Sequence, residues 1–303
     1  MSDTNNGNPY EEYPQTPHPE DQPGYGYSPY QGQQAYQDPY GAPLGSSAQP
    51  GVREMGTGKI DVMRAVNWGL STTFKNWTVW ILATLAFFTV LFVISFVVSI
   101  VTVVANGGEP TASPAITLFS AAAGLAVSLL FYNAATRQLD RAKIGWGDFF
   151  RGMNAGPLIG FLLLNAALGM LLLTVVELIA IGSVQTLAGV DPAIDWATLS
   201  KALAGQAVAM LISFLIAPLL VFIPFFLADR RAGFVDAIRL GIAAGARNYG
   251  KLLLAMFLIG LVGFLAALVT LGLGALVVLP AYMLVNAHLY RQAAGFELPV
   301  EQR

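Results

Sequence analysis

The pattern with the most chemical potential in this sequence is an aspartate followed three residues later by an arginine. It occurs three times, as Asp61 and Arg64 in DVMR, Asp148 and Arg151 in DFFR, and Asp236 and Arg239 in DAIR. A carboxylate beside a guanidinium could hold a polar substrate or assist a proton transfer. No histidine or activated nucleophile accompanies these pairs in the sequence, so we do not expect catalysis from them.

Helix physics accounts for the same pattern without a reaction. An aspartate in the first turn of a helix accepts hydrogen bonds from free backbone N–H groups and suits the positive end of the helix dipole. An arginine three residues later can pair with it, for about 0.2–0.5 kcal/mol, or reach anionic lipid headgroups. The aspartates are 87 and 88 residues apart, from 61 to 148 and from 148 to 236, and each motif precedes a long apolar run. The pattern therefore predicts three copies of one helix-start element that marks repeat number and topology.

Two ionisable residues lie within apolar runs. Glu177 is the only acid inside a predicted span, and a carboxylate within a membrane is a candidate proton or cation site. It lies about 20 residues, or roughly 30 Å of helix, from the start of its span, which also fits a place near the outer headgroups. Both interpretations of Glu177 stay open. His288 has no second histidine in any predicted span, so packing or an interfacial hydrogen bond is expected rather than a metal site.

Three prolines interrupt apolar segments, Pro218 and Pro224 in one and Pro280 in another. A proline inside a helix frees a carbonyl and kinks the helix, and transporters build substrate sites from broken helices. Together with Glu177, these prolines define an alternative function. The chain would then be a small transporter or lipid-handling membrane protein with a pathway between its repeats.

The composition identifies the class of protein that must position these residues. Of 303 residues, 55% are hydrophobic and 11% are charged, whereas a soluble domain has about 25% charged residues. So few charges cannot cover a water-soluble surface, and an integral membrane protein is predicted. The absence of cysteine excludes disulfides, thiolate metal sites and a cysteine nucleophile. Common nucleotide-binding and hydrolase motifs are absent, and the sparse basic residues do not support nucleic-acid binding, so we expect no cofactor.

The apolar runs predict the membrane elements. A spanning helix needs about 20 apolar residues, and the longest run must be divided at Gly272-Leu-Gly274. The predicted spans cover 78–104, 115–135, 157–184, 206–227, 252–270 and 275–290. The expected fold class is all-α integral membrane, with six transmembrane helices as three hairpins, each preceded by a cytoplasmic interfacial helix.

The basic residues predict the orientation. Of the 16 lysines and arginines, all but Lys201 fall on one side of this topology. The positive-inside rule then places both termini in the cytoplasm, with the spans in the plasma (inner) membrane. On the opposite side, residues 190–206 are expected to form a short amphipathic helix on the outer leaflet, anchored by Trp196.

The hairpins suggest an internal repeat. The predicted repeats cover about 58–136, 137–228 and 229–295, followed by a short cytoplasmic C-terminus at 296–303. Asp140-Arg141 after the second span matches Asp229-Arg230 after the fourth. A fixed period of this kind indicates one building block used three times.

The interfacial helices are expected to sink an apolar face into the membrane surface. In the first helix, Ile60, Met63 and Val66 form a candidate face. Near the third, the spacing Gly241-x-x-x-Gly245 could allow close packing. One such match among 31 glycines carries little weight.

Residues 1–57 are predicted to be a disordered cytoplasmic tail with seven acids and one base. Residues 1–50 hold nine of the 17 prolines and seven of the 11 tyrosines, with few aliphatic side chains that could form a core. The tail is either a tether that recruits partners or a solubilising spacer. Its start, MSDTNNGNPY, lacks the pattern of a signal peptide, so no cleaved leader is expected.

Two loose resemblances cover most of the chain. The stretch from Pro224 through ADRRAGFVDAIRLGIAAGARNYGKLL to Tyr290-Arg291-Gln292 resembles the multi-pass domain of bacterial membrane-anchored glycerophosphodiesterases and related membrane proteins. The Tyr/Pro/Gly-rich tail ahead of six spans is similar to the proline- and glycine-rich transmembrane proteins of actinobacteria. These resemblances imply a bacterial membrane domain. They transfer no catalytic residue, because the soluble phosphodiesterase barrel of more than about 200 residues is not part of this sequence.

The expected function is non-enzymatic. The chain would act as a scaffold or accessory subunit for envelope or membrane machinery, with the lipid bilayer and other membrane or envelope proteins as partners. Recruitment through the tail would supply specificity. A transporter or lipid-handling role remains the alternative, and the sequence names no substrate, partner or oligomeric state.

Overall fold

The computed structural model describes residues 54–107, 114–181 and 196–299. These residues are all-α, without a strand beyond one antiparallel bridge between Met55 and Glu297. The predicted tail up to residue 53 and the first part of the predicted outer helix, residues 190–195, lie outside the described residues.

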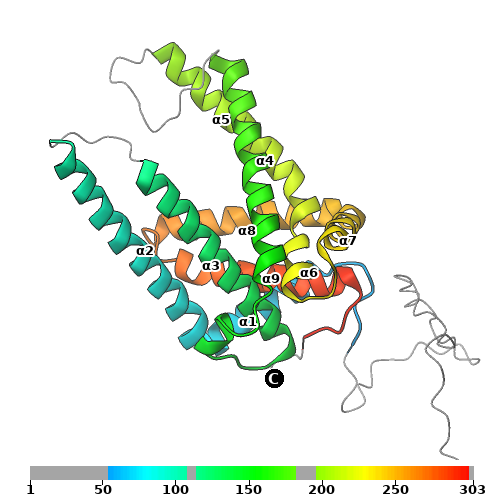
Figure 1. The fold of residues 1–303 in the computed structure, drawn as a ribbon. Helices are drawn as coiled ribbons and strands as arrows, with labels where there is room; N and C mark the ends of the chain where they lie inside the picture. Colours follow the sequence, from blue (N-terminus) through cyan, green and yellow to red (C-terminus); the bar gives the residue numbers. More distant parts are fainter. Residues whose placement is uncertain (1–53, 108–113, 182–195, 300–303) are drawn as a thin grey trace, which may run out of the picture. The chain divides into compact units, whose positions relative to one another are not determined.

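The described helices follow the order of the predicted apolar runs (Figure 1). They are α1 (Val62–Lys75), α2 (Trp77–Ala105), α3 (Pro114–Asp140), the 3-10 helix η2 (Trp146–Phe149), α4 (Ala155–Ile181), α5 (Trp196–Leu220), α6 (Ile223–Ala228), α7 (Phe234–Arg247), α8 (Tyr249–Val269) and α9 (Ala275–Ala294). In Figure 1, α4 runs up the page, whereas α8 and α9 run across it.

Five helices in the described residues are long and apolar enough to cross a membrane. They are α2, α3 from Leu118 onward, α4 to Ile179, α5 from Leu199 onward, and α8. The sixth predicted span is helical as α9 but does not qualify, because it carries Asn286, His288, Arg291 and Gln292. All four of these side chains are buried against protein. A hydropathy threshold cannot anticipate the burial of these side chains, because it treats every polar residue as exposed to lipid.

The prolines of the fourth predicted span have two different effects. Pro218 lies inside α5, which continues to Leu220. Pro224 lies in the first turn of α6, where its missing N–H costs nothing. Its ring would clash with the carbonyl four residues earlier, at Leu220, and α5 ends at that residue. At its other end, α5 begins at Trp196, so residues 196–206 continue the span and do not form the separate surface helix that was predicted.

α1 packs along α9. At the contact, a Cβ on Gly69 would lie 2.7 Å from Cγ2 of Val285, so only glycine permits this approach. The predicted lipid-facing surface of this segment was wrong for Ile60, which is 3% exposed, and for Val66, which packs on the core. Met63 is 69% exposed, as expected.

α7 packs on the break between α5 and α6. A Cβ on Gly245 would lie 2.3 Å from the carbonyl oxygen of Pro218, and one on Gly241 would lie 2.5 Å from Cγ1 of Ile223. The Gly-x-x-x-Gly spacing is therefore a packing motif here. The expectation from the sequence that this single match means little was wrong.

The second motif does not begin an interfacial helix of comparable length. Its aspartate lies in the four-residue 3-10 helix η2, followed by a turn with Gly152 at φ 50°. Gly145, Gly147 and Gly152 lie within eight residues of one another, and glycine is costly inside an α-helix. This local composition explains why the predicted helix is shortened to a turn.

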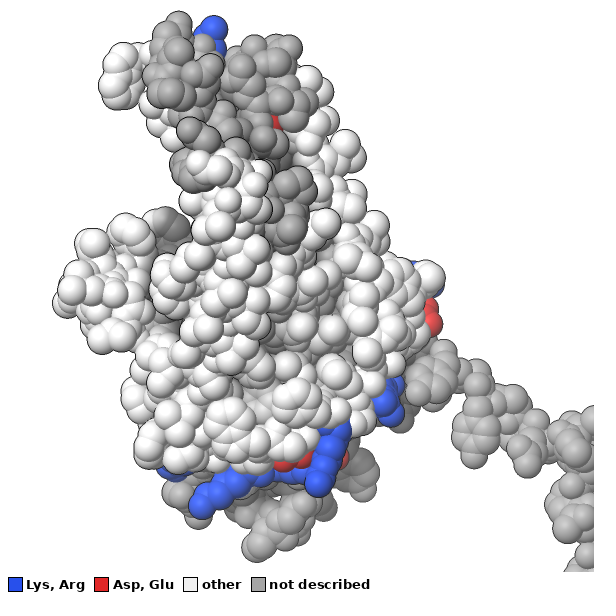
Figure 2. Space-filling view, turned by 60° about the vertical axis from the view of Figure 1, so that its left-hand side comes forward, with Lys and Arg blue, Asp and Glu red and all other residues white. Residues whose placement is uncertain are grey.

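The buried core lies where α1, the start of α2, α3, η2, α6 and the second half of α9 meet. Its fully buried members include Trp80, Phe149, Phe222, Ile223, Phe225, Leu227, Leu284 and Tyr290. Long apolar flanks of α2, α4 and α8 remain exposed, as a lipid-facing surface requires. Figure 2 shows such a flank as mostly uncharged, with lysine and arginine side chains gathered chiefly at one end of the molecule, here called the basic end.

Candidate functional site

The residues of the predicted transport pathway do not meet at one place. Glu177 is 8% exposed and lies 22 residues after the start of α4. Asn154, directly before α4, donates from Nδ2 to the carbonyl oxygen of Leu227 in α6, at 2.8 Å. Pro218 and Pro224 flank the junction of α5 with α6, so they lie with the start of α4 and not with Glu177.

The remaining residues singled out on α9 belong to the protein interior. Pro280 lies inside α9 and is buried. His288 is 1% exposed, and its Nδ1 accepts a hydrogen bond from Nε2 of Gln292 at 2.9 Å. Its ring lies 5.3 Å from that of Trp68. This environment agrees with the packing role expected for His288.

The first Asp-x-x-Arg motif starts a helix, as predicted. Oδ1 of Asp61 accepts a hydrogen bond from the backbone N–H of Arg64 at 3.0 Å and caps α1. The guanidinium of Arg64 binds both carboxylate oxygens of Glu54, at 2.8 and 2.7 Å. Glu54 therefore supplies a carboxylate partner that the motif alone did not predict.

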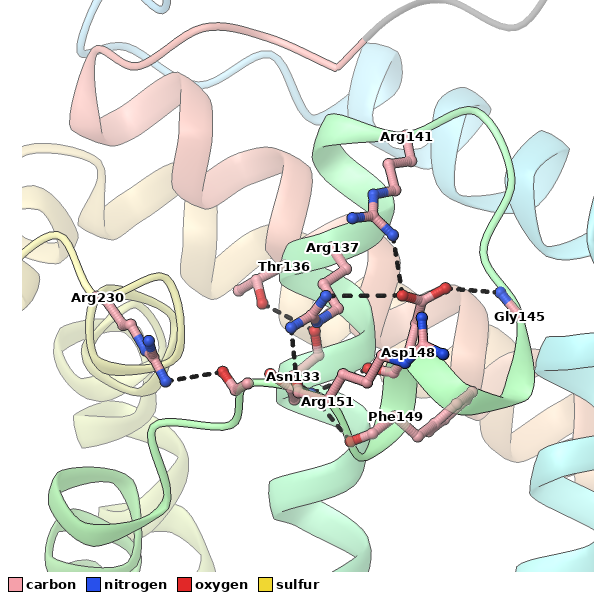
Figure 3. A network of polar contacts seen from close by, with 10 residues as sticks. Asn133, Thr136, Arg137, Arg141, Gly145, Asp148, Phe149, Arg151 and Arg230 are labelled. Atoms are coloured by element: carbon pink, nitrogen blue, oxygen red, sulfur yellow. Dashed lines mark hydrogen bonds and ion pairs between the residues drawn. The ribbon is translucent and has the colours of Figure 1, made fainter.

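The second motif uses its aspartate differently (Figure 3). Oδ1 of Asp148 lies 2.9 Å from Arg141 and 3.6 Å from Arg137, and Oδ2 accepts from the backbone N–H of Gly145 at 2.9 Å. The predicted pairing with Arg151 is wrong, because the ion pairs of Asp148 in the described residues are with Arg141 and Arg137. The backbone carbonyl of Arg151 accepts a hydrogen bond from Arg137 at 2.6 Å. η2 ends at Phe149, so Arg151 lies beyond it in a turn and does not share a helix face with Asp148.

Asn133 fixes the same loop from α3. Its Nδ2 lies 2.9 to 3.0 Å from the carbonyl oxygens of Asp148, Phe149 and Arg151. Arg230 reaches this loop from beyond α6 by donating to the carbonyl of Gly152 at 3.0 Å (Figure 3). The network therefore holds the loop between α3 and α4 in one conformation.

The third motif has the predicted position but no internal pair. Asp236 lies in the first turn of α7 without a side-chain capping bond. Within the described residues, no ion pair joins Asp236 to Arg239. The three motifs thus share a place before a long helix, and each has different contacts.

The most constrained charge in the described chain is Arg291, which sequence reasoning treated only as part of a resemblance. Its side chain is 1% exposed, and Nη2 lies 3.0 Å from Oδ1 of Asp140 and 3.3 Å from Oδ2 of Asp229. These residues come from the ends of α9 and α3 and from the position after α6. A buried guanidinium is tolerated only when it is paired, so this ionic junction ties three helix ends together.

Asp229 has further partners at the junction. Arg231 Nε lies 2.9 Å from Oδ2 of Asp229, and the Tyr290 hydroxyl donates to the same oxygen at 3.1 Å. Burial raises the pKa of Asp229 above its ordinary value, although Arg291 and Arg231 act in the opposite direction. A signal for this site was present in the sequence, as a lone arginine late in an uncharged run.

Three asparagines, here called the asparagine clamps, each lie directly before a long helix and donate to a backbone carbonyl elsewhere. The bonds are Asn76 to Ala142 at 3.2 Å, Asn154 to Leu227 at 2.8 Å, and Asn248 to Gly58 at 3.0 Å. The helices that follow are α2, α4 and α8. Each acceptor lies shortly before η2, α7 or α1 respectively.

Residues 54–61, here called the strap, are held across the end of α9. The N–H of Gly58 donates to the carbonyl of Gln292 at 3.0 Å, and Nε2 of Gln292 donates to the carbonyl of Asp61 at 3.1 Å. The N–H of Leu298 donates to the carbonyl of Glu54 at 2.7 Å. The strap therefore pairs with the segment that follows α9.

These contacts define what the basic end can do. Its polar side chains mostly bind backbone carbonyls or one another, which stabilises loops and helix ends rather than presenting a reactive group. The described residues contain no group of three or more histidines, aspartates or glutamates placed to hold a metal ion. The candidate functional site is therefore the basic end itself, as a rigid surface.

No family model, curated protein or solved structure gives a significant match to this chain. The resemblances to multi-pass membrane domains stay predictions.

Proposed function

We propose that this chain is a non-enzymatic multi-pass membrane protein that serves as a scaffold or accessory subunit for envelope or membrane machinery. The observation that carries the proposal is the use of the buried polar side chains. Four of them, Asn76, Asn133, Asn248 and Gln292, bind backbone carbonyls of other segments, and Arg291 pairs with two carboxylates. A basic end fixed in this way suits a binding surface between the spans and the tail.

The proposal includes six passes, with both ends of the described chain on the cytoplasmic face of a bacterial inner membrane. The pairing of Glu54 with Leu298 supports this, because it brings both ends of the described chain to one place. An even number of crossings fits this arrangement. Five helices qualify by composition, and α9, with its polar residues turned inward, would supply the sixth. If α8 and α9 lay along the surface instead, the number would be four.

Labelling of single cysteines tests this topology directly, because the chain has no native cysteine. Leu271 is 93% exposed in the turn between α8 and α9. With six passes, Leu271→Cys and Lys201→Cys react with a membrane-impermeant maleimide from outside, and Lys143→Cys reacts only after lysis. Protection of Leu271→Cys in intact cells, with Lys201→Cys reactive, would rule out six passes.

The proposal also includes an internal repeat of three modules, at about 58–136, 137–228 and 229–295, in which the third module packs against the first. α1 packs on α9 and α7 packs on α5 and α6, while η2 packs on α3. The first element of each module, which is α1, η2 or α7, thus packs on the last helix of the preceding module. For α1, the preceding module is the third one. The three asparagine clamps repeat the same order. This arrangement supports a shared origin of the modules and explains why the strap belongs to the folded unit.

Crosslinking in native membranes followed by mass spectrometry tests the scaffold role. The full-length chain should capture defined membrane or envelope proteins, and a chain lacking residues 1–50 should lose part of that set while keeping the strap. If neither chain enriches any protein over a six-span control of similar abundance, the scaffold role is wrong.

One observation favours the alternative. Glu177 is 8% exposed inside α4, although a carboxylate among headgroups would be accessible. A transporter or lipid-handling role would use this buried acid as a proton or cation site. Exchange Glu177→Gln should then abolish a proton-coupled flux in vesicles, whereas a scaffold would keep its partners.

A further inference from the structure

Three cations meet where the strap crosses the start of α8. The clamp residue Asn248 fixes the strap there, because its Oδ1 accepts from the N–H of Ile60 at 3.1 Å. Lys251 Nζ donates to the carbonyl of Ile60 at 3.2 Å. Arg247 Nη1 lies 4.0 Å from the position that a Cβ on Gly58 would occupy, and Lys59 follows next in the strap.

These three cations, here called the corner, keep hydrogen-bond donors available. Lys59, Arg247 and Lys251 are all exposed. In the described residues, the side chains of Arg247 and Lys251 bind backbone carbonyls only, with Arg247 Nη2 donating to Ala293 at 3.1 Å. An ammonium has three donors and a guanidinium has five, so most remain unused. By contrast, Arg141 on the same end of the molecule is paired with a carboxylate.

With α8 as a membrane span, the corner would lie at the depth of lipid headgroups. α8 is a candidate span over Tyr249–Val269, and Lys251 lies in its first turn. Further along α8, Leu254 is 59% and Phe257 is 54% exposed. These side chains provide an apolar flank for an acyl chain. Cations at the edge of a span with apolar residues beneath them match the two parts of a phospholipid.

We infer that Lys59, Arg247 and Lys251 form a binding site for the phosphate of an anionic lipid headgroup. The site goes beyond the scaffold role, since it requires only that α8 lies in the bilayer. Because Asn248 and Lys251 hold the strap at the same point, a bound headgroup would also stabilise the strap against the end of α9.

Native mass spectrometry of the purified full-length chain tests the site. The protein is exposed to equal amounts of phosphatidylglycerol and phosphatidylcholine with identical acyl chains, and the retained lipids are counted. The wild type should retain phosphatidylglycerol preferentially. The variant K59Q/R247Q/K251Q should lose at least about tenfold of that preference, because each cation near an anionic surface contributes a factor of roughly five.

A matched triple variant separates a site from general charge. K143Q/R151Q/R239Q removes the same charge from exposed residues away from the corner and should keep the preference. Equal loss in both triples would overturn the inference. K59Q alone leaves the bonds of Arg247 and Lys251 intact and should give a partial loss even if the triple folds poorly. Full retention by K59Q and by a folded triple also overturns it.

Soluble phosphate supplies a further arm of the test. In detergent without lipid, inorganic phosphate should leave the melting temperature unchanged, whereas phosphatidylglycerol should raise it in the wild type and not in the triple. Equal stabilisation by inorganic phosphate would assign the corner to a soluble anion and overturn the lipid assignment.

Discussion

Arg291 and Asp229 form an ion pair of 3.3 Å in which the side chains are 1% and 10% exposed. The pair joins the last turn of α9 to the residue after α6, and Asp140 extends it to α3. Desolvation makes such a pair costly to form and more costly to break, because the remaining partner is left buried and unpaired.

Exchange Arg291→Ala should therefore lower the free energy of unfolding by about 3–5 kcal/mol. Thermal unfolding in detergent measures the change. Arg141→Ala is the control, since its side chain is 54% exposed and its pair with Asp148 should be worth about 0–1 kcal/mol. Similar losses in both variants would show that burial does not set the energetic weight of Arg291.

Asp229 should give the stability a pH dependence of defined sign. Burial raises the pKa of Asp229 in the folded state, so the folded protein holds this proton more tightly than the unfolded chain does. The contribution of this group is then lost as pH rises from the ordinary aspartate pKa, about 4, to the higher folded value. Over that interval the wild type should lose stability relative to Asp229→Asn. A difference in melting temperature that is constant with pH would contradict the raised pKa.

Gly245 should tolerate no side chain. A Cβ there would lie 2.3 Å from the carbonyl oxygen of Pro218, which is backbone and cannot move aside. Gly245→Ala should cost about 1–3 kcal/mol or shift α7 off α5. Gly250→Ala in α8 meets nothing within 4 Å and should be neutral or slightly stabilising. If both substitutions are equally harmless, α7 does not pack through its glycines.

The clamp at Asn248 should be worth more than an exposed asparagine. Asn248→Ala leaves the N–H of Ile60 and the carbonyl of Gly58 without their partner, at about 1–3 kcal/mol for a buried group. Asn67→Ala changes an exposed residue of α1 and should have little effect. Hydrogen exchange should show faster exchange of the Ile60 amide in the first variant only. Unchanged protection of that amide would contradict the clamp.

The three motif aspartates should differ in importance despite their shared pattern. Asp148→Ala removes contacts to Arg141, Arg137 and the Gly145 amide, and should destabilise the protein by about 1–3 kcal/mol. Asp236→Ala removes a first-turn charge without a capping bond and should cost about 0.3–1 kcal/mol. Chemical denaturation compares the two. Equal effects of the two substitutions would indicate an identical role for the motifs and would contradict the difference in their contacts.

Much of the membrane architecture follows from local sequence. The length and apolarity of residues 78–104 predict α2 almost to its ends, because a span depends on the transfer of a continuous segment into lipid. Asp61 as a helix cap is equally local, since its acceptor and donor are three residues apart. Composition also shortens the second motif, where three glycines favour a turn over a helix.

The sequence by itself predicted an all-α chain with six long apolar segments, five of which are helices long and apolar enough to cross a membrane. Only the tertiary structure decided that the second half of α9 is buried, that Arg291 binds Asp140, and that Asn248 holds the strap. The physical reason is separation along the chain. Arg291 and Asp140 are 151 residues apart and Asn248 and Gly58 are 190 apart, so their contacts exist only once the helices have packed.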